Sequence, residues 1–227
     1  MTAPMLRAQE RPVIIPAGLT RLPGTLALPD HPSGLVLFAH GSGSSRLSPR
    51  NQFVARQIRA AGVGTLLFDL LTEEESANRA LVFDIDLLAG RLLAATEWVA
   101  RQAELEGLSI GYFGASTGAA AALKAAARSV TPVQAVVSRG GRPDLAGEAL
   151  PVVTAPTLLI VGGRDLEVLE LNRQALRQLT CTKRLVVVPG ATHLFEEPGT
   201  LEEAAKWAAE WFIHYLAMER TWHKAQR

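Results

Sequence analysis

The chain has very little cysteine, since Cys181 is its only thiol. A single thiol cannot form an intrachain disulfide, and it excludes a metal site built from cysteines. An excess of one charge is also missing, because 23 Lys and Arg residues balance 22 Asp and Glu residues to a net charge of +1. This balance favours neither a nucleic acid nor an anionic membrane as a partner.

Long apolar segments are missing as well. No uninterrupted apolar run reaches the ~20 residues of a membrane-spanning helix, and the first ten residues lack the apolar core of a signal peptide. We therefore expect no membrane partner and a cytoplasmic location. The length of 227 residues suits one domain with a sizeable core. We expect a single domain over 1–227, with 1–11 as a flexible N-terminal extension.

Predicted strands and helices alternate along the chain, and most of the strands are continuous apolar runs. Such runs are typical of a parallel sheet that is covered on both faces. The expected strands are 12–16, 25–28, 35–39, 64–68, 108–113, 133–137, 157–163 and 184–189. The expected helices are 49–61, 77–105, an Ala-rich segment after 116, 166–179 and 201–218. The sequence thus predicts an α/β fold whose reactive groups gather at the carboxyl ends of the strands.

Residues 114–118 read Gly-Ala-Ser-Thr-Gly and lie between an apolar run and an Ala-rich helix. A serine on such a sharp strand-to-helix turn has its Oγ pushed out of the sheet, and the tightness of the turn requires glycines beside it. The five-residue pattern alone is weak, but its setting makes it strong. We interpret Ser116 as a nucleophile.

A nucleophilic serine needs a base, and the base needs an acid that orients it. The expected chain order is serine, acid, histidine. Asp165 directly follows one predicted strand, and His193 follows the next one. Asp165 could instead only cap a helix, and His193 could be an ordinary loop residue. The order favours catalysis over these interpretations, and over the other candidate histidines His31, His214 and His223.

The oxyanion of an acyl-transfer intermediate needs backbone N–H donors. One expected donor is the N–H of Thr117, the residue after the nucleophile. The second is expected from the loop that follows strand 35–39, with Ser42 as the donor and Gly41 beside the substrate. A merely flexible polar turn is the alternative interpretation of this loop.

These motifs resemble the α/β-hydrolases, and among them the small, lidless enzymes of the dienelactone hydrolase type. The matching segments are 39–43, 114–118, 162–165 and 190–193, which span most of the chain. The resemblance implies an α/β-hydrolase fold with a mostly parallel eight-stranded sheet, helices on both faces and no lid domain. It also implies a Ser/Cys–His–Asp triad that acts on esters, and the mechanism calls for no metal or organic cofactor.

One residue departs from the family pattern. Dienelactone hydrolases carry cysteine as the nucleophile, whereas this chain has Ser116, which favours a general carboxylesterase over a lactone hydrolase. Segments 48–50 and 138–142 resemble a bacterial branch that is related to hydrolase domains fused to phosphoribosyltransferase-like domains. In a chain of this length we expect no such second domain.

Arginines follow two of the strands near the predicted site. Arg46 and Arg50 follow the oxyanion loop, and Arg139 and Arg142 follow strand 133–137. A guanidinium suits a planar anion, so Arg46, Arg139 and Arg142 are candidates to bind a carboxylate or phosphate on a small ester substrate. The simpler alternative is that they pair with Asp69, Asp144 or loop carbonyls.

Only about 18 residues separate Val137 from the next strand, and this is where lid domains are usually inserted. An open site predicts small esters with short acyl chains.

The same triad could serve a thioesterase, an acyltransferase, a peptidase or a lactone hydrolase, and the fold can also serve as a non-catalytic ligand receptor. An aromatic stripe could line a dimer face or pack on the core, so we expect a monomer or a homodimer; it comprises Trp207, Trp211 and Tyr215.

Overall fold

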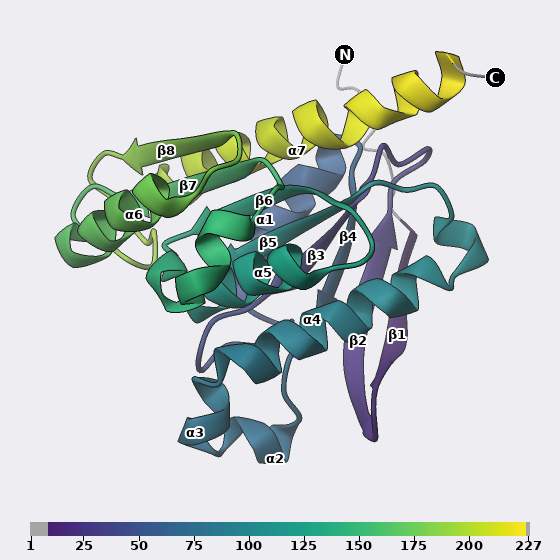
Figure 1. Cartoon of the computed structure of the whole chain (residues 1–227), viewed down its shortest axis with the longest axis horizontal. Coiled ribbons are helices and arrows are strands. Elements are labelled where there is room, and N and C mark those ends of the chain that lie inside the picture. The colour runs from purple at the N-terminus through teal and green to yellow at the C-terminus, as the bar shows by residue number, and fades with distance from the viewer. Residues whose placement is uncertain (1–8, 226–227) are drawn as a thin grey trace.

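The computed structural model describes residues 9–225, which form one eight-stranded sheet with helices around it (Figure 1). The strand order is β1-β2-β4-β3-β5-β6-β7-β8. β2 pairs antiparallel with β1 and β4, and all other neighbours are parallel. The expected mostly parallel sheet is therefore confirmed. The strands are β1 (Gln9–Ala17), β2 (Thr20–Leu28), β3 (Leu35–Ala39), β4 (Gly64–Phe68), β5 (Ile110–Ala115), β6 (Val133–Arg139), β7 (Thr157–Gly162) and β8 (Lys183–Val188).

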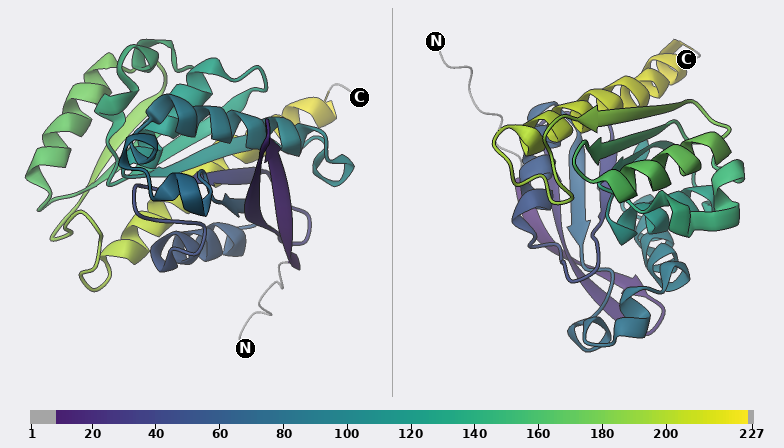
Figure 2. Two further views of the ribbon diagram at one scale, coloured as in Figure 1. Left: turned by 90° about the horizontal axis from the view of Figure 1, so that it is seen from below. Right: turned by 90° about the vertical axis from the view of Figure 1, so that its left-hand side faces the viewer.

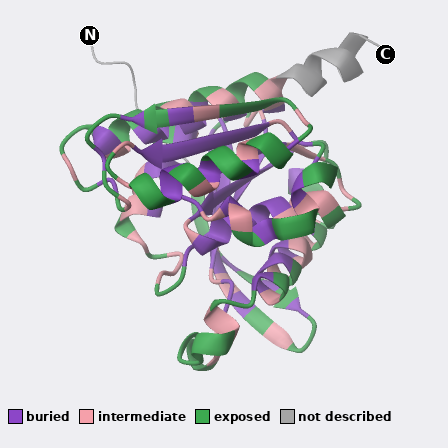
Figure 3. Cartoon of the chain, turned by 60° about the vertical axis from the view of Figure 1, so that its left-hand side comes forward, coloured by how far each residue is buried: buried purple, intermediate pink, exposed green. Residues whose placement is uncertain are grey.

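Helices cover both faces of the sheet (Figure 2). One face carries α1 (Pro49–Ala60) and α7 (Thr200–Ala225), which also contact each other. The other face carries α4 (Ile85–Ala100), α5 (Thr117–Arg128) and α6 (Leu166–Gln178). Every residue of β3, β4, β5 and β7 is consequently buried, which explains the uninterrupted apolar runs in the sequence (Figure 3).

The first two strands are longer than the sequence patterns predicted. They form a hairpin that turns at Gly18, whose φ of 64° lies in the left-handed region. Gln9 pairs with Leu28, so residues 9–11 belong to β1 and are not part of a flexible extension. In β1 only alternate residues near the end of the strand are buried, and this weak signal explains the short prediction. Residues 1–8 lie outside the described part of the chain.

The single helix predicted over 77–105 is wrong, because the chain is capped and restarted twice. The Asn78 side chain accepts the N–H of Ala80, and the Asp84 side chain accepts the N–H of Leu87. Each cap satisfies free N–H groups at a new helix start, which favours a break over a continuous helix. The segment accordingly divides into α3 (Arg79–Val82), α4 and the 3₁₀ turn η1 (Ala103–Leu105), and the short helix α2 (Glu73–Ser76) precedes it.

The aromatic stripe of α7 packs on the core. Trp207, Trp211 and Tyr215 are half-buried against the cluster beneath α1 and α7. Trp211 also donates its indole N–H to the carbonyl of Pro156 at 3.2 Å, and the Arg184 guanidinium lies 4.3 Å from the ring centre of Trp207. These contacts give all three aromatic side chains an intramolecular role.

The segment between β6 and β7 contains only the short helical stretch η2 (Pro143–Val152). It packs against α5 and α6. The expected absence of a lid domain at this position is confirmed. Among the described residues, no helix combines the length and the apolar character needed to cross a membrane.

The junction of β5 and α5 depends on close backbone contact. A Cβ on Gly114 would overlap the Cα of Ala119, and one on Gly118 would overlap the carbonyl oxygen of Ala39. Glycine at both positions therefore lets α5 start against the ends of β3 and β5.

We predict that Gly114→Ala lowers the free energy of unfolding by at least ~2 kcal/mol, because neither the end of β5 nor the start of α5 can move easily to make room for the Cβ. The matched control is Gly90→Ala on the exposed side of α4, where a Cβ would meet no atom within 4 Å. That change should stabilise the protein by ~0.5–1 kcal/mol. Urea unfolding of both variants measures the difference, and equal effects would contradict this account of the junction.

Candidate active site

Ser116 lies at the turn between β5 and α5, with φ of 51° and ψ of −124°. A non-glycine residue rarely adopts this conformation, and hydrogen bonds from neighbouring segments must hold it there. Its N–H donates to the carbonyl of Arg139 at 3.3 Å, and its own carbonyl accepts the N–H of Arg142 at 3.0 Å. The turn after β6 thus holds the serine backbone from both sides, and the Ser116 residue remains partly exposed.

Asp165 and His193 meet at the neighbouring strand ends. Asp165 follows β7, His193 follows β8, and Nδ1 of His193 lies 2.7 Å from Oδ2 of Asp165. Asp165 stands at the start of α6, but its side chain caps no N–H of that helix. Its carboxylate contacts the imidazole instead, which is the arrangement that a catalytic acid–base pair requires.

Ser116 and His193 border the same turn. A Cβ on Gly140 would lie 2.9 Å from the His193 carbonyl oxygen and 3.9 Å from Cε1 of its ring. Gly140 directly follows Arg139, whose carbonyl accepts the Ser116 N–H. In the described residues no hydrogen bond joins the Ser116 hydroxyl to the imidazole. Catalytic hydrogen bonds are often long before substrate binds, so this arrangement remains compatible with a base–nucleophile pair.

The loop after β3 reaches Ser116. A Cβ on Gly41 would lie 2.9 Å from the Cβ of Ser116, so only glycine allows this approach. The N–H of Ser42, the expected oxyanion donor, donates to the Thr117 hydroxyl oxygen at 3.0 Å. The structure therefore brings Ser42 and Thr117 together beside Ser116, with the Ser42 N–H bound to the Thr117 side chain.

His40 is a residue that the sequence analysis did not assign to the site. Its side chain is buried, its Nδ1 lies 3.0 Å from the Gly41 carbonyl oxygen, and its Nε2 accepts the N–H of Leu70 at 3.0 Å. Burial lowers the pKa of His40 below the ordinary 6.5, although the Gly41 hydrogen bond and the charge of Asp69 oppose the shift. The sequence signal that could have assigned His40 to the site is its position directly after a buried strand.

Two of the three candidate arginines pair with acids. Arg46 binds Asp69 through its backbone N–H at 2.7 Å and through its guanidinium. Arg142 binds Asp144 through two hydrogen bonds of 2.9 and 2.8 Å. Arg46 and Arg142 therefore pair with acids of the protein itself, which is the simpler of the two interpretations of these arginines.

Arg139 differs from the other two arginines. It is the last residue of β6, only 7% exposed, and among the described residues no acid pairs with it. Its Nη2 lies 3.4 Å from Oδ1 of Asn51, its Nε and Nη1 have no partner, and the guanidinium lies 5.8 Å from the ring centre of Phe195. Burial, and secondarily the charge of Arg50, lowers the pKa of Arg139 to about 10. It remains a buried, uncompensated cation near neutral pH.

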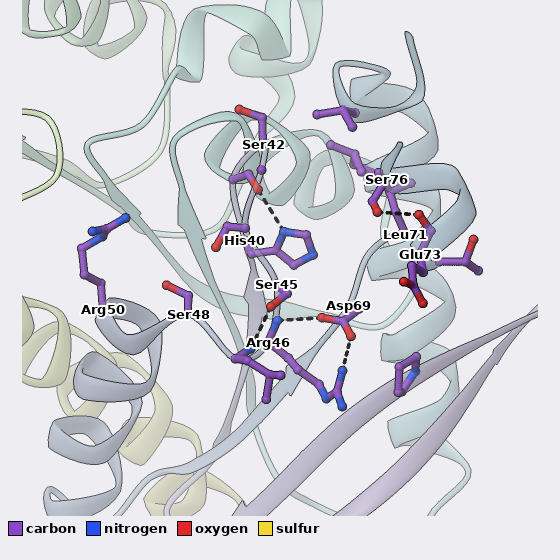
Figure 4. A pocket seen from close by; sticks show the side chains of 18 of the residues that line it. His40, Ser42, Ser45, Arg46, Ser48, Arg50, Asp69, Leu71, Glu73 and Ser76 are labelled. Carbon is purple, nitrogen blue, oxygen red and sulfur yellow. Dashed lines mark hydrogen bonds and ion pairs between the residues drawn. The ribbon is translucent and has the colours of Figure 1, made fainter. Parts of the chain in front are cut away.

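A pocket of about 920 Å³ opens beside the loop that follows β3 (Figure 4). Its size falls in the range of small-molecule sites. Its polar lining includes His40, Ser42, Arg46, Arg50, Asp69 and Glu73. Within residues 9–225, no group of three or more His, Cys, Asp or Glu side chains is arranged to hold a metal ion.

We predict that acid destabilises the protein through His40. Because its pKa is lowered in the folded state, the unfolded chain binds a proton that the native histidine does not, and the free energy of unfolding falls as the pH drops below ~6.5. One proton contributes at most ~1.4 kcal/mol per pH unit. Between about pH 7.5 and pH 4.5, the Tm should fall less steeply with decreasing pH for His40→Asn than for the wild type. Identical slopes would contradict this assignment.

Comparison with known proteins places this geometry in a family. The crystal structure of a dienelactone hydrolase from Anabaena variabilis is 57% identical in sequence, with a TM-score of 0.90 over 92% of this chain and 99% of that one. The esterase Est1E from Butyrivibrio proteoclasticus shares the fold, with a TM-score of 0.77 over 91% of this chain and 99% of that one at 18% identity.

A Mycobacterium tuberculosis protein named "Putative phosphoribosyl transferase" is 60% identical over 213 residues, which cover 94% of this chain and 48% of that protein. The chain thus spans about half the length of the curated relatives it matches. The family model described as "Dienelactone hydrolase family" matches residues 52–220. The chain therefore belongs to the dienelactone hydrolase family.

Proposed function

We propose that the protein is a serine esterase that hydrolyses carboxylic esters through Ser116, His193 and Asp165. The observation that carries the proposal is the 2.7 Å contact between His193 and Asp165, at the same sheet edge as the strained Ser116 turn. Membership in a hydrolase family and the α/β-hydrolase fold support the reaction class. The fold alone would not, since it hosts several functions.

The mechanism follows from the roles of the three side chains. His193 takes the Ser116 proton as Oγ attacks the ester carbonyl, while Asp165 holds the imidazole and stabilises its charge. The protonated His193 then gives this proton to the leaving alcohol, which leaves an acyl-enzyme. Water attacks the acyl group in the same way, and the acid is released. The oxyanion formed in each half-reaction is stabilised by the N–H groups of Thr117 and Ser42.

The substrate class follows from the open site. Only a short helical stretch occupies the connection between β6 and β7, so little protein is present there to enclose a long acyl chain. We expect small esters with short acyl chains. Thioester hydrolysis, acyl transfer or lactone opening could use the same side chains, and product analysis with competing nucleophiles would separate these reactions.

We predict that Ser116→Ala lowers kcat for p-nitrophenyl acetate by at least ~10³-fold, because the acyl-enzyme can no longer form. Cys181→Ser, which changes a side chain whose thiol contacts the Thr157 hydroxyl, serves as the control and should keep its activity. A Ser116→Ala protein with the wild-type rate would refute the esterase mechanism.

We further propose that the preferred ester carries an anionic group, which Arg139 binds. A buried guanidinium without an acid is costly, and an anion from the substrate would compensate it. The backbone carbonyl of Arg139 accepts the Ser116 N–H, so the Arg139 backbone lies beside Ser116. Arg46 and Arg142 are already neutralised by Asp69 and Asp144 and are weaker candidates.

We predict that Arg139→Met lowers kcat/KM for a carboxylate-bearing ester relative to a neutral ester by ~10–100-fold. It should also raise the Tm of the free enzyme, because it removes an uncompensated buried charge. Arg142→Met is the control and should keep the substrate ratio. A purely structural Arg139 would show the opposite pattern, with a lower Tm and an unchanged ratio.

A further inference from the structure

His40 joins two backbone segments that are distant in the sequence. Its Nε2 accepts the N–H of Leu70, just beyond β4, so this nitrogen carries no proton. In the neutral ring the proton must then reside on Nδ1, which donates it to the carbonyl oxygen of Gly41 at 3.0 Å. Lowering of the His40 pKa by burial supports the neutral ring. The hydrogen-bond network thus selects one tautomer.

The Gly41 carbonyl is also fixed from a second side. It accepts the N–H of Ser44 at 3.2 Å, in a tight turn in which Gly43 has a φ of 66°. The carbonyl belongs to the same planar peptide unit as the N–H of Ser42. In a trans peptide these two groups point in opposite directions. Holding the carbonyl on the His40 side therefore directs the Ser42 N–H to the other side.

That other side is the nucleophile turn. The Ser42 N–H donates to Oγ1 of Thr117 at 3.0 Å, and Thr117 is the residue after Ser116. A Cβ on Gly41 would lie 2.9 Å from the Cβ of Ser116, so a bulkier residue does not fit at this position. A chain of contacts thus runs from Leu70 through His40 and the Gly41–Ser42 peptide to the start of α5.

We propose that His40 is the positioning residue for the oxyanion hole: its Nδ1–H holds the Gly41–Ser42 peptide so that the Ser42 N–H faces the reacting carbonyl. The proposal rests on the proposed esterase function. In the free enzyme the Thr117 hydroxyl accepts this N–H and keeps it satisfied. The oxyanion takes it over when it forms.

The exchange of acceptors favours the transition state. The neutral carbonyl oxygen of the substrate is an acceptor comparable to the Thr117 hydroxyl. The Ser42 N–H therefore gains little when the neutral carbonyl replaces the hydroxyl as its acceptor. A charged oxyanion forms a hydrogen bond about twice as strong as a neutral acceptor does. The Ser42 N–H is therefore transferred mainly when charge develops, and interactions made only in the transition state raise kcat.

A matched pair of variants separates the two bonds of His40. In His40→Asn the amide Nδ2 occupies roughly the place of Nδ1 and can donate to the Gly41 carbonyl, but the Leu70 N–H loses its acceptor. In His40→Gln the amide oxygen occupies roughly the place of Nε2 and can accept from Leu70, but the Gly41 carbonyl loses its donor. Each variant loses one hydrogen bond, so a merely structural role predicts similar losses of activity and of Tm.

The proposal predicts a difference in kcat. His40→Gln should lower kcat by ~10–100-fold with little change in KM, because a misdirected oxyanion donor costs transition-state binding. His40→Asn should recover at least ~10-fold of that loss, although both variants have similar Tm values. Equal kcat losses in the two variants, or losses confined to KM, would overturn the proposal.

A measurement on the unmodified protein covers the case in which the variants fail to fold. In ¹⁵N-histidine NMR spectra, the buried His40 should give a non-titrating Nδ1–H tautomer near neutral pH. An Nε2–H tautomer or a charged ring would overturn the proposal. If the wild type hydrolyses no ester at all, the proposed function fails, whereas an active wild type with the wrong tautomer removes only the role of His40.

Discussion

The site depends on close approach of three backbone segments around Ser116. Gly118 allows α5 to start against the end of β3, and Gly41 allows the loop after β3 to lie against Ser116. The turn after β6 then holds the strained serine through two backbone hydrogen bonds. Without these contacts a φ of 51° would not be stable for a serine, and its hydroxyl would not stand clear of the sheet.

Much of this arrangement could be predicted from the sequence because parallel sheets leave strong local signals. A buried strand is a continuous apolar run, and the residue that follows it must lie at the carboxyl edge. Asp165 and His193 were identified by that rule, and the structure places them in contact. Gly114 and Gly118 were expected for the same reason, since a sharp strand-to-helix turn excludes side chains.

Other features could not be predicted from apolar periodicity and the order of the strands alone. Asn78 and Asp84 interrupt a helical pattern through local capping, which competes with apolar periodicity. His40 has a role only because the backbone of Leu70 lies beside it, 30 residues later. The difference between Arg139 and Arg142 likewise depends on which acids the fold brings near each guanidinium.

The most direct test of the account is covalent labelling with a fluorophosphonate, followed by mass spectrometry of the labelled peptide. We expect one adduct per chain on Ser116, formed much more slowly when His193 is replaced by Asn, because the serine then has no base. Absence of labelling, or an adduct on any other residue, would contradict the assignment of Ser116 as the nucleophile.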